Sequence, residues 1–164
     1  MIIEGKLIPF GEDLTEVFDI RRKVFVEEQG IPEKIAFDKY DYLAIHAIVF
    51  QGTNQGKAIA TGRIVYDGDS CRLGFIAVLK ECRGNQYGDF VVRMLMNKAF
   101  NAGVKRISVN AQVASVKFYK KIGFIQEGEE FIADGIRQIS MIISRDCLIT
   151  QCIKNKETLE EIRE

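Results

Sequence analysis

The first third of the chain carries a helical pattern of apolar residues. Between residues 14 and 25, apolar side chains recur every three or four positions, which is the spacing of an amphipathic helix. Asp13, followed three residues later by Glu16, is a helix-start signal of the capping-box kind, so the helix is predicted to begin near Leu14. Gly30 ends the pattern. One apolar stripe of this helix is therefore expected to face the core.

Strand-like runs dominate the middle of the chain. Three of them, separated by turn sequences, predict an antiparallel meander at 42–51, 57–66 and 71–78. The third run is apolar at nearly every position from its third residue, as expected of a central strand covered on both faces. A short strand is also predicted at 6–10. The segment 33–42 predicts a connection that is either solvated or lies over a substrate site.

Helices and strands alternate in the second half of the chain. The predicted elements are a strongly apolar helix, a strand, a second helix and a closing hairpin, at 90–100, 106–111, 114–121, and 124–131 with 138–144. The resulting order, β-α-β-β-β-α-β-α-β-β, predicts an α/β (α+β) protein with a mixed, mostly antiparallel sheet and helices on both faces. We expect one domain of residues 1–146 and a tail of residues 147–164, either a short helix or a frayed end.

Charge and hydropathy exclude several classes of partner. The 164 residues contain 23 Lys and Arg and 23 Asp and Glu, so the chain has no net positive field with which to bind nucleic acid. No run of apolar residues approaches the ~20 that a membrane-spanning helix needs, and residues 1–6 lack the features of a signal peptide. We therefore expect a cytoplasmic protein without nucleic-acid or membrane partners.

The cysteines and the single histidine form no metal-binding pattern. The cysteines are Cys71, Cys82, Cys147 and Cys152. None of them forms a C-x-x-C pair, and His46 is far from all four in sequence. We predict no metal site and free thiols, with Cys71 in the core.

A candidate anion site lies between the third meander strand and the apolar helix that follows it. The connection holds Arg83, Gly84 and Gly88, and its end is a helix N-terminus, where backbone N–H groups lack intrahelical acceptors. Glycine allows the backbone to approach a ligand closely, and Arg83 can add a permanent positive charge. The loop fits neither G-x-G-x-x-G nor G-x-x-x-x-G-K-[ST]. It therefore binds phosphates in another way, or is an ordinary turn.

Three motifs resemble one known family. R-G-N-Q-Y-G at 83–88 resembles the Q/R-x-x-G-x-G/A acyl-CoA loop of the GNAT superfamily of N-acetyltransferases. Asn110, Ala114 and the run F-Y-K-K-I-G-F at 118–124 resemble a second segment of that superfamily. R-R-K-V-F-V-E-E-Q-G-I-P at 21–32 resembles the amino-terminal run of its YjcF/ElaA-like bacterial branch. The resemblance implies a sheet splayed at its centre, where two neighbouring parallel strands separate into a V-shaped gap.

Two positions depart from the superfamily pattern. Gln86 occupies the place where the loop usually has its first glycine, which could crowd a pyrophosphate or alter the turn. Phe75 occupies a strand position where many members carry a basic residue. Most phosphate contacts in such a loop come from backbone N–H groups, which glutamine still has.

The resemblance implies a binding site for acetyl-CoA as co-substrate. Loop N–H groups would hold the pyrophosphate, and backbone groups of the splayed strand would pair with the pantetheine arm. Asn110 either contacts the donor or closes its strand. The implied donor-binding residues are Ile76, Ala77, Val78, Arg83, Gly84, Asn85, Gln86, Tyr87, Gly88, Asp89, Asn110 and Phe118.

The resemblance also implies how catalysis would proceed. Tyr119 matches the tyrosine that serves as general acid to the CoA thiolate, and a phenol can donate that proton. The N–H of Ile76 or Ala77 is the candidate for stabilising the oxyanion. Glu28 and His46, with Glu27 as a third candidate, could remove a proton from the attacking amine, directly or through water.

The function predicted in this way is transfer of an acetyl group from acetyl-CoA to a primary amine, by direct attack in a ternary complex. The alternative is a non-catalytic module that binds or senses acyl-CoA. A polyamine, an amino sugar, an antibiotic, a peptide N-terminus or a lysine all remain candidate acceptors. An exposed edge in the final hairpin could also pair two copies as a homodimer.

Overall fold

The computed structural model describes residues 1–53 and 56–148, and these residues form one mixed sheet of eight strands. Seven strands follow the order β1-β2-β3-β4-β5-β8-β6, and β7 pairs with β8. Their bounds are β1 Ile3–Ile8, β2 Ile45–Gln51, β3 Lys57–Asp67, β4 Ser70–Val78, β5 Arg106–Gln112, β6 Ile125–Gln126, β7 Phe131–Ala133 and β8 Ile136–Ser144. Only β4 and β5 pair in parallel among the described strands, so the mostly antiparallel sheet predicted from the sequence is confirmed.

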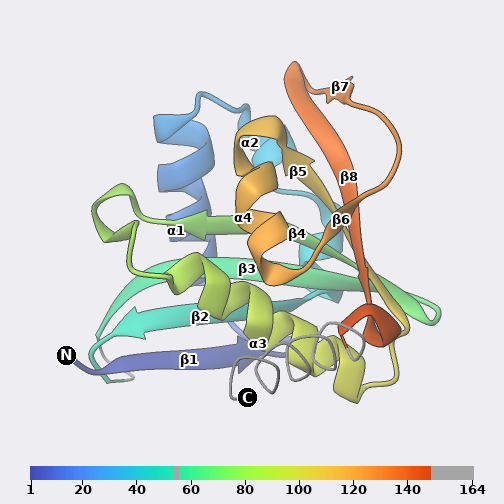
Figure 1. The fold of residues 1–164 in the computed structure, drawn as a ribbon. Helices are drawn as coiled ribbons and strands as arrows, with labels where there is room; N and C mark the ends of the chain where they lie inside the picture. The colour runs from blue at the N-terminus through green and yellow to red at the C-terminus, as the bar shows by residue number, and fades with distance from the viewer. Residues whose placement is uncertain (54–55, 149–164) are drawn as a thin grey trace, which may run out of the picture.

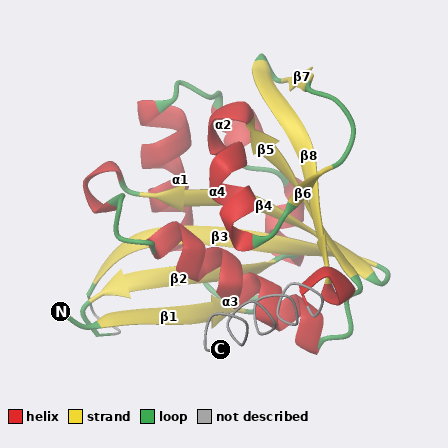
Figure 2. Cartoon of the chain, viewed as in Figure 1, coloured by secondary structure: helices red, strands yellow, loops and turns green. Residues whose placement is uncertain are grey.

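Helices cover both faces of this sheet (Figures 1 and 2). The α-helices are α1 Thr15–Arg21, α2 Glu33–Ala36, α3 Tyr87–Asn101 and α4 Val116–Ile122. A π-helical segment, η1 Arg22–Glu28, continues α1, and three short 3₁₀ turns are η2 Lys39–Leu43, η3 Lys80–Cys82 and η4 Val113–Ser115. α3 and α4 lie in front of the sheet in Figure 1, and α1 lies behind it. The layered arrangement expected from the sequence is therefore present.

The sheet separates between its two parallel strands. β4 and β5 pair only from Ser70 with Arg106 to Leu73 with Val109, and beyond these four pairs they have no register. β1 to β4 therefore form one half-sheet, and β5 turns away with β8 to form the other (Figure 1). This confirms the V-shaped gap that the family resemblance implied. It also leaves backbone groups of β4 without a partner strand on the side of the gap.

A β-bulge lies on β4 where the gap opens. Thr61 of β3 pairs with Ala77 and Arg63 with Gly74, so β4 holds one more residue than β3 between these pairs. Phe75 in the bulge has a φ of +49°, which is left-handed and uncommon for a residue other than glycine. Gly62 faces the bulge, and a Cβ there would be only 2.4 Å from a methyl carbon of Ile76. The absence of a side chain at Gly62 thus allows the bulge to pack.

Several predicted elements differ in detail. The first strand begins earlier than predicted, at Ile3, because it pairs along its length with β2. Segment 33–42 is not a solvated connection, since Ala36 and Asp41 are buried. The closing hairpin is split: between β6 and β7 the chain passes through Glu127 to Glu130 without pairing continuously with β8. Charged residues and a glycine of positive φ explain this interruption.

The remaining predictions on organisation have mixed outcomes. Cys71 is buried, as predicted, and burial raises the pKa of its thiol to about 12. Residues 145–148 are helical, whereas 149–164, which include Cys152, lie outside the described residues. The division into a domain of residues 1–146 and a tail stays a prediction, as does a homodimer. In the described part of the chain, no helix is long and apolar enough to cross a membrane, and no side-chain cluster has a metal-binding arrangement.

Candidate active site

Two cavities lie near the place where the sheet separates. The first, here called the loop pocket, has a volume of about 530 Å³ and lies at the N-terminus of α3. The second, here called the cleft, has a volume of about 440 Å³ and lies over β4, β5 and β8. Neighbouring residues divide between them: Val78 and Phe118 line the loop pocket, whereas Ile76 and Tyr119 line the cleft. A molecule that passes between β4 and α4 would therefore reach from one cavity into the other.

The loop pocket is built around free backbone donors. The first backbone hydrogen bond of α3 runs from the N–H of Phe90 to the carbonyl of Gln86, at 3.0 Å. The N–H groups of Tyr87, Gly88 and Asp89 therefore have no intrahelical acceptor and lie at the positive end of the helix dipole. These three residues line the pocket together with Gln86. The arrangement suits a bound phosphate.

The turn before α3 keeps the shape that a glycine would give it. Gln86 has a φ of +62°, so it adopts the left-handed conformation directly before the helix. Asn85 stabilises the turn, because its side-chain amide donates to the carbonyls of Cys82 and Arg83, at 3.1 and 3.3 Å. Glutamine at position 86 thus preserves the loop at the expense of backbone strain.

Replacing Gln86 with glycine is expected to raise the free energy of unfolding by up to about 1 kcal/mol, because glycine has no Cβ to strain at this φ. Gln86→Val is expected to lower it by about 1–2 kcal/mol, since β-branched residues tolerate left-handed backbone poorly. Urea unfolding of the two variants beside the wild type measures both values. Equal stability of the two variants would mean that residue 86 does not hold this conformation in solution.

Arg83 lines the loop pocket, but its guanidinium is already hydrogen-bonded to other groups of the protein. Its guanidinium makes two hydrogen bonds to the carboxylate of Glu28, at 2.6 and 2.7 Å, and its Nε donates to the carbonyl of Val78 at 3.1 Å. The hydrogen bonds from Arg83 lower the pKa of Glu28, which keeps this carboxylate ionised and makes it a weak base. The ion pair joins the end of η1 to the loop that precedes α3.

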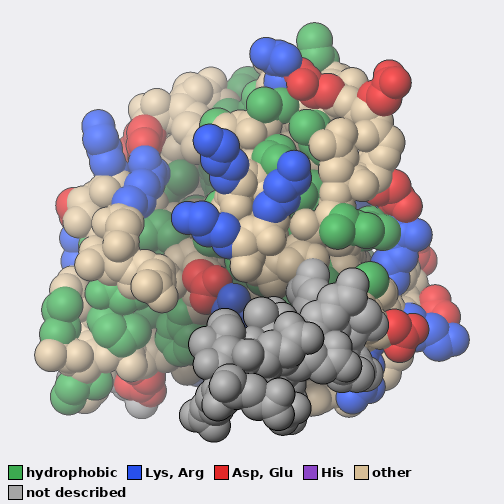
Figure 3. Space-filling model, in the orientation of Figure 1, with side chains coloured by type: hydrophobic (Ala, Val, Ile, Leu, Met, Phe, Trp, Pro, Cys, Tyr) green, Lys and Arg blue, Asp and Glu red, His purple; other side chains and the backbone are tan. Residues whose placement is uncertain are grey.

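A cation that the sequence reasoning missed also lines the loop pocket. Lys121 of α4 is exposed, lines this pocket and makes no ion pair within the described residues. Its signal was present in the F-Y-K-K-I-G-F run, where only the aromatic residues were assigned roles. Lys117 and Lys120 of the same helix are also exposed, and Figure 3 shows Lys and Arg side chains gathered over α4. Their charges favour an anionic ligand here.

Tyr119 of α4 lines the cleft, and its neighbour Phe118 lines the loop pocket. Tyr119 is 6% exposed and packs edge-on against Phe118 and Phe124, with ring centroids 4.9 and 5.5 Å away. Within the described residues its hydroxyl makes no hydrogen bond, although the residue lines the cleft. Burial raises the pKa of Tyr119, so its hydroxyl stays protonated at neutral pH and is available as a donor.

A buried ionic network supports the bulge from behind. Asp41 is 1% exposed and pairs with Arg21 of α1 and with Arg63 of β3, the latter at 2.5 Å. Arg63 also makes two hydrogen bonds to the carboxylate of Asp38, at 2.6 and 2.7 Å. Arg21 donates in addition to the carbonyl of Ala36. Two buried arginines are thus compensated by two carboxylates of the segment between α2 and β2.

Both arginines of this network stack on the bulge residue. The guanidinium carbon of Arg21 lies 3.8 Å from the ring centroid of Phe75, and that of Arg63 lies 4.5 Å away. Phe25 packs edge-on against the same ring, at 5.7 Å. Cation–π attraction is strongest where the cation is desolvated, as it is here. Phe75 thus has two basic groups against its ring, and they come from the neighbouring elements α1 and β3.

The other predicted site residues occupy different places. Asn110 is exposed and lines the cleft beside Tyr119. His46 is 1% exposed, and its Nε2 donates to the carbonyl of Asp41 at 2.8 Å. Burial lowers its pKa, so the ring is neutral. Neither His46 nor Glu28 lines the cleft, and the assignment of either as a base stays a prediction.

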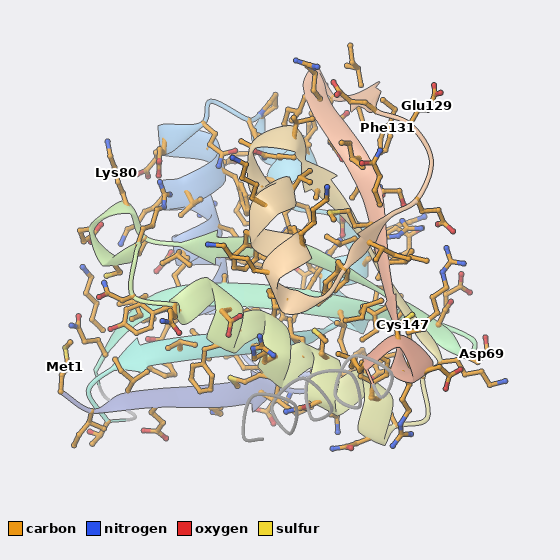
Figure 4. The ribbon with its side chains drawn as sticks, in the orientation of Figure 1. Met1, Asp69, Lys80, Glu129, Phe131 and Cys147 are labelled. Atoms are coloured by element: carbon orange, nitrogen blue, oxygen red, sulfur yellow. The ribbon has the colours of Figure 1, made fainter. Side chains whose placement is uncertain are left out.

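Charged residues of the cleft were also missed in the sequence. They are Asp38, Arg63, Arg72 and Asp134. They come from four separate segments, so no local motif could bring them together. In Figure 4, Lys80 marks the segment that leads from β4 towards α3, and Phe131 marks β7, with α4 between them in this view.

The fold and the paired cavities define the class of protein, and comparison with known proteins gives the family. Residues 38–145 match the family model described as an acetyltransferase (GNAT) domain. The uncharacterized N-acetyltransferase YjcF of Bacillus subtilis is 31% identical over 80% of this chain and 92% of its own length. The chain belongs to the GNAT acetyltransferase family, and the recognition made from the sequence is confirmed.

Solved structures show the same fold. Escherichia coli ElaA superimposes with a TM-score of 0.75 at 24% identity, covering 86% of this chain and 99% of its own. A GNAT family acetyltransferase from Elizabethkingia anophelis, with acetyl-CoA bound, superimposes with a TM-score of 0.65 at 14% identity, over 87% and 97% of the two chains. The YjcF/ElaA-like branch inferred from the amino-terminal motif is thus represented among the similar proteins.

Proposed function

We propose that the protein transfers the acetyl group of acetyl-CoA to a primary amine by direct attack in a ternary complex. One observation carries this proposal: the loop pocket and the cleft are lined by nearby residues of β4, Val78 and Ile76, where this strand has no partner on the side of the gap. A donor held in the loop pocket would bring its thioester to this part of β4, and an amine in the cleft would approach it from the other side. The acetyl-CoA seen in the Elizabethkingia relative supports the choice of donor.

The donor would be held mainly by the backbone. The free N–H groups at the start of α3, with Lys121 beside them, would bind the pyrophosphate. The amide-rich pantetheine arm of the donor would pair with β4 along Ile76 to Val78, which face the gap left by β5. This arrangement explains why the strand can be apolar at its side chains and still recognise a polar arm.

The chemical step needs an oxyanion donor and an acid. Phe75 and Ile76 have no partner in the β3 register, so an N–H group at the bulge is available to the thioester oxygen as charge develops there. The amine nitrogen forms a bond to the carbonyl carbon, the carbon–sulfur bond then breaks, and the departing thiolate takes the proton of Tyr119. The phenolate regains a proton from water.

Removal of the proton from the amine is best assigned to water in the cleft. Glu28 is bound to Arg83, and His46 is buried away from the cleft. Asp38 does line the cleft, and burial alone would raise the pKa of its carboxyl. The hydrogen bonds and charge of Arg63 outweigh that effect and lower the pKa, which makes Asp38 a weak base as well.

A second candidate function is the non-catalytic binding of acyl-CoA. The observation that favours it is the engagement of the predicted bases in other contacts. The two functions share the loop pocket and differ in whether a bound donor reacts. A test must therefore measure donor binding and transfer separately.

Isothermal titration of the purified protein with acetyl-CoA is expected to show one-to-one binding at least about tenfold tighter than that of adenosine diphosphate, because the diphosphate lacks the arm. Release of free CoA in the presence of a panel of primary amines then measures transfer. Saturable binding without transfer to any amine would favour the sensing module. No binding of acetyl-CoA up to millimolar concentration would overturn both functions.

A further inference from the structure

The floor of the cleft, formed by β5 and β8, combines polar side chains with the apolar Val109, Ala111 and Ile136. Along β5, Ser108, Asn110 and Gln112 alternate with buried Ile107, Val109 and Ala111. Asn110 pairs with Ser140 and Gln112 with Gln138 on β8, so polar residues of both strands share one face. The opposite face of the same strands is apolar and buried.

The polar side chains of this floor bring hydrogen-bonding groups into the cleft. Asn110, Gln112 and Gln138 line the cleft, and the side chain of Gln112 accounts for one contact, donating to Gln29 at 3.1 Å. Gln29 follows η1, so amide groups are present on both the floor and the side of the cleft. An apolar acceptor would leave these groups without partners, which costs binding free energy. The cleft therefore suits a polar acceptor.

Four charged residues line the cleft, and two of them, Arg72 and Asp134, form no ion pair within the described residues. Asp38 and Arg63 neutralise each other through two hydrogen bonds. Arg72, on β4, lines the cleft and forms no ion pair within the described residues. Its partner on β5 is Ser108, at the closed end of the gap between the half-sheets. The cleft thus offers a permanent cation on β4 and, in the turn before β8, the carboxyl group of Asp134, which has no ion-pair partner in the described part of the chain.

Arg72 stands at a useful distance from the reaction centre. It lies three positions before Phe75 of the bulge, which corresponds to about 10 Å along a strand. A flexible arginine side chain covers part of that length. A group bound to its guanidinium would therefore be separated from the reacting nitrogen by a few covalent bonds.

Resting on the function proposed above, we infer that the acceptor is a small amine that also carries a carboxylate, such as an amino acid or a short peptide, and that Arg72 binds this carboxylate. The guanidinium presents paired donors that match the two carboxylate oxygens. The amides of the floor bind the polar groups between carboxylate and amine. Arg72 is then a specificity-determining residue, and polyamines, which carry no anion, are poor substrates.

Matched acceptors test this inference. Each amino acid or dipeptide in a panel of increasing spacing between amine and carboxylate is paired with its own carboxamide, and kcat/KM is measured for both. We expect the wild type to prefer the best acid over its amide by at least about tenfold, the typical effect of one charge-assisted hydrogen bond. In Arg72→Gln this preference should fall below about threefold, with acetyl-CoA binding unchanged. Arg137→Gln is the control, since Arg137 is an exposed arginine of β8 that pairs with Glu130 outside the cleft.

The outcomes separate this inference from the proposed function. Transfer to amines with equal or greater rates for the amides overturns the carboxylate and leaves the acetyltransferase function standing. Retention of the acid preference in Arg72→Gln also overturns the role of Arg72. Titration of the CoA-loaded protein with the same acids covers the case of no turnover, because failure of every acid to bind would exclude a carboxylate site whether or not transfer occurs.

Discussion

Tyr119→Phe is expected to lower kcat by about 10²–10⁴-fold, the usual contribution of a positioned general acid, while the Kd for acetyl-CoA changes by less than about twofold. The ring is held by Phe118 and Phe124, and phenylalanine keeps both contacts. Only the hydroxyl, which makes no hydrogen bond within the described residues, is lost. Single-turnover transfer and isothermal titration measure the two quantities.

The pH profile gives the same prediction a second readout. Burial raises the pKa of Tyr119, so its proton is retained across the range in which enzymes are normally assayed. The rate is expected to rise with pH as the acceptor amine loses its own proton, without an alkaline loss below about pH 9. Tyr66→Phe is the control, because Tyr66 also has a buried hydroxyl without a partner in the described residues but does not line the cleft. An equal loss of kcat in both variants would assign the effect to packing.

Asp41→Asn is expected to lower the free energy of unfolding by about 3–5 kcal/mol, the usual result of removing one partner from a buried ion pair. Asparagine preserves the size of the side chain but leaves Arg21 and Arg63, which are 1% and 7% exposed, with less compensation of their charge. Chemical unfolding followed by circular dichroism measures the change. A loss below about 1 kcal/mol would show that the two arginines find other partners or water.

An exposed aspartate provides the control for this prediction. Asp69 pairs with Lys105 at 3.2 Å, and its side chain is 70% exposed. Asp69→Asn removes the same charge from a solvated pair, so its effect on stability is expected to stay below about 1 kcal/mol. The difference between the two aspartates isolates burial from charge. The Asp41 variant should also lose activity at temperatures where it remains folded, because its network supports the Phe75 ring.

The fold could be predicted from the sequence wherever one local pattern decided the structure. The helix of residues 87–101 was recognised because its apolar residues repeat at helical spacing, and the meander because turn sequences interrupt its strands. The separation of β4 from β5 was implied only by the family resemblance. Nothing in the local pattern of residues 74–78 distinguishes a strand that loses its partner from one that keeps it.

The split of the final hairpin shows a different limit. Residues 124–131 contain enough apolar and β-branched residues to predict a strand, but pairing depends on the register that β8 offers. β6 and β7 pair with separate parts of β8, and between them the N–H of Glu127 still donates to the carbonyl of Ser140 on β8, at 2.8 Å. A prediction from one strand at a time could not include that dependence.

The candidate site, like the fold, could be predicted from the sequence only in part. The donor loop is contiguous, so its glycines and the helix that follows could be identified together. The ionic network is not contiguous: Arg21 was noted as part of a motif, but its partner Asp41 lies 20 positions further along the chain. The polar floor was visible as alternation in residues 108–112, yet alternation alone does not say whether water or a ligand covers a polar face.

The four residue pairs between β4 and β5 have a mechanical consequence. They join the two half-sheets at one end only. We therefore expect the half-sheets to move apart most easily at the opposite, unpaired end. Leu73 and Val109 form the last of these four pairs, and both are buried at the joined end. A substitution there would change the opening at the far end by more than the size of the side chain itself.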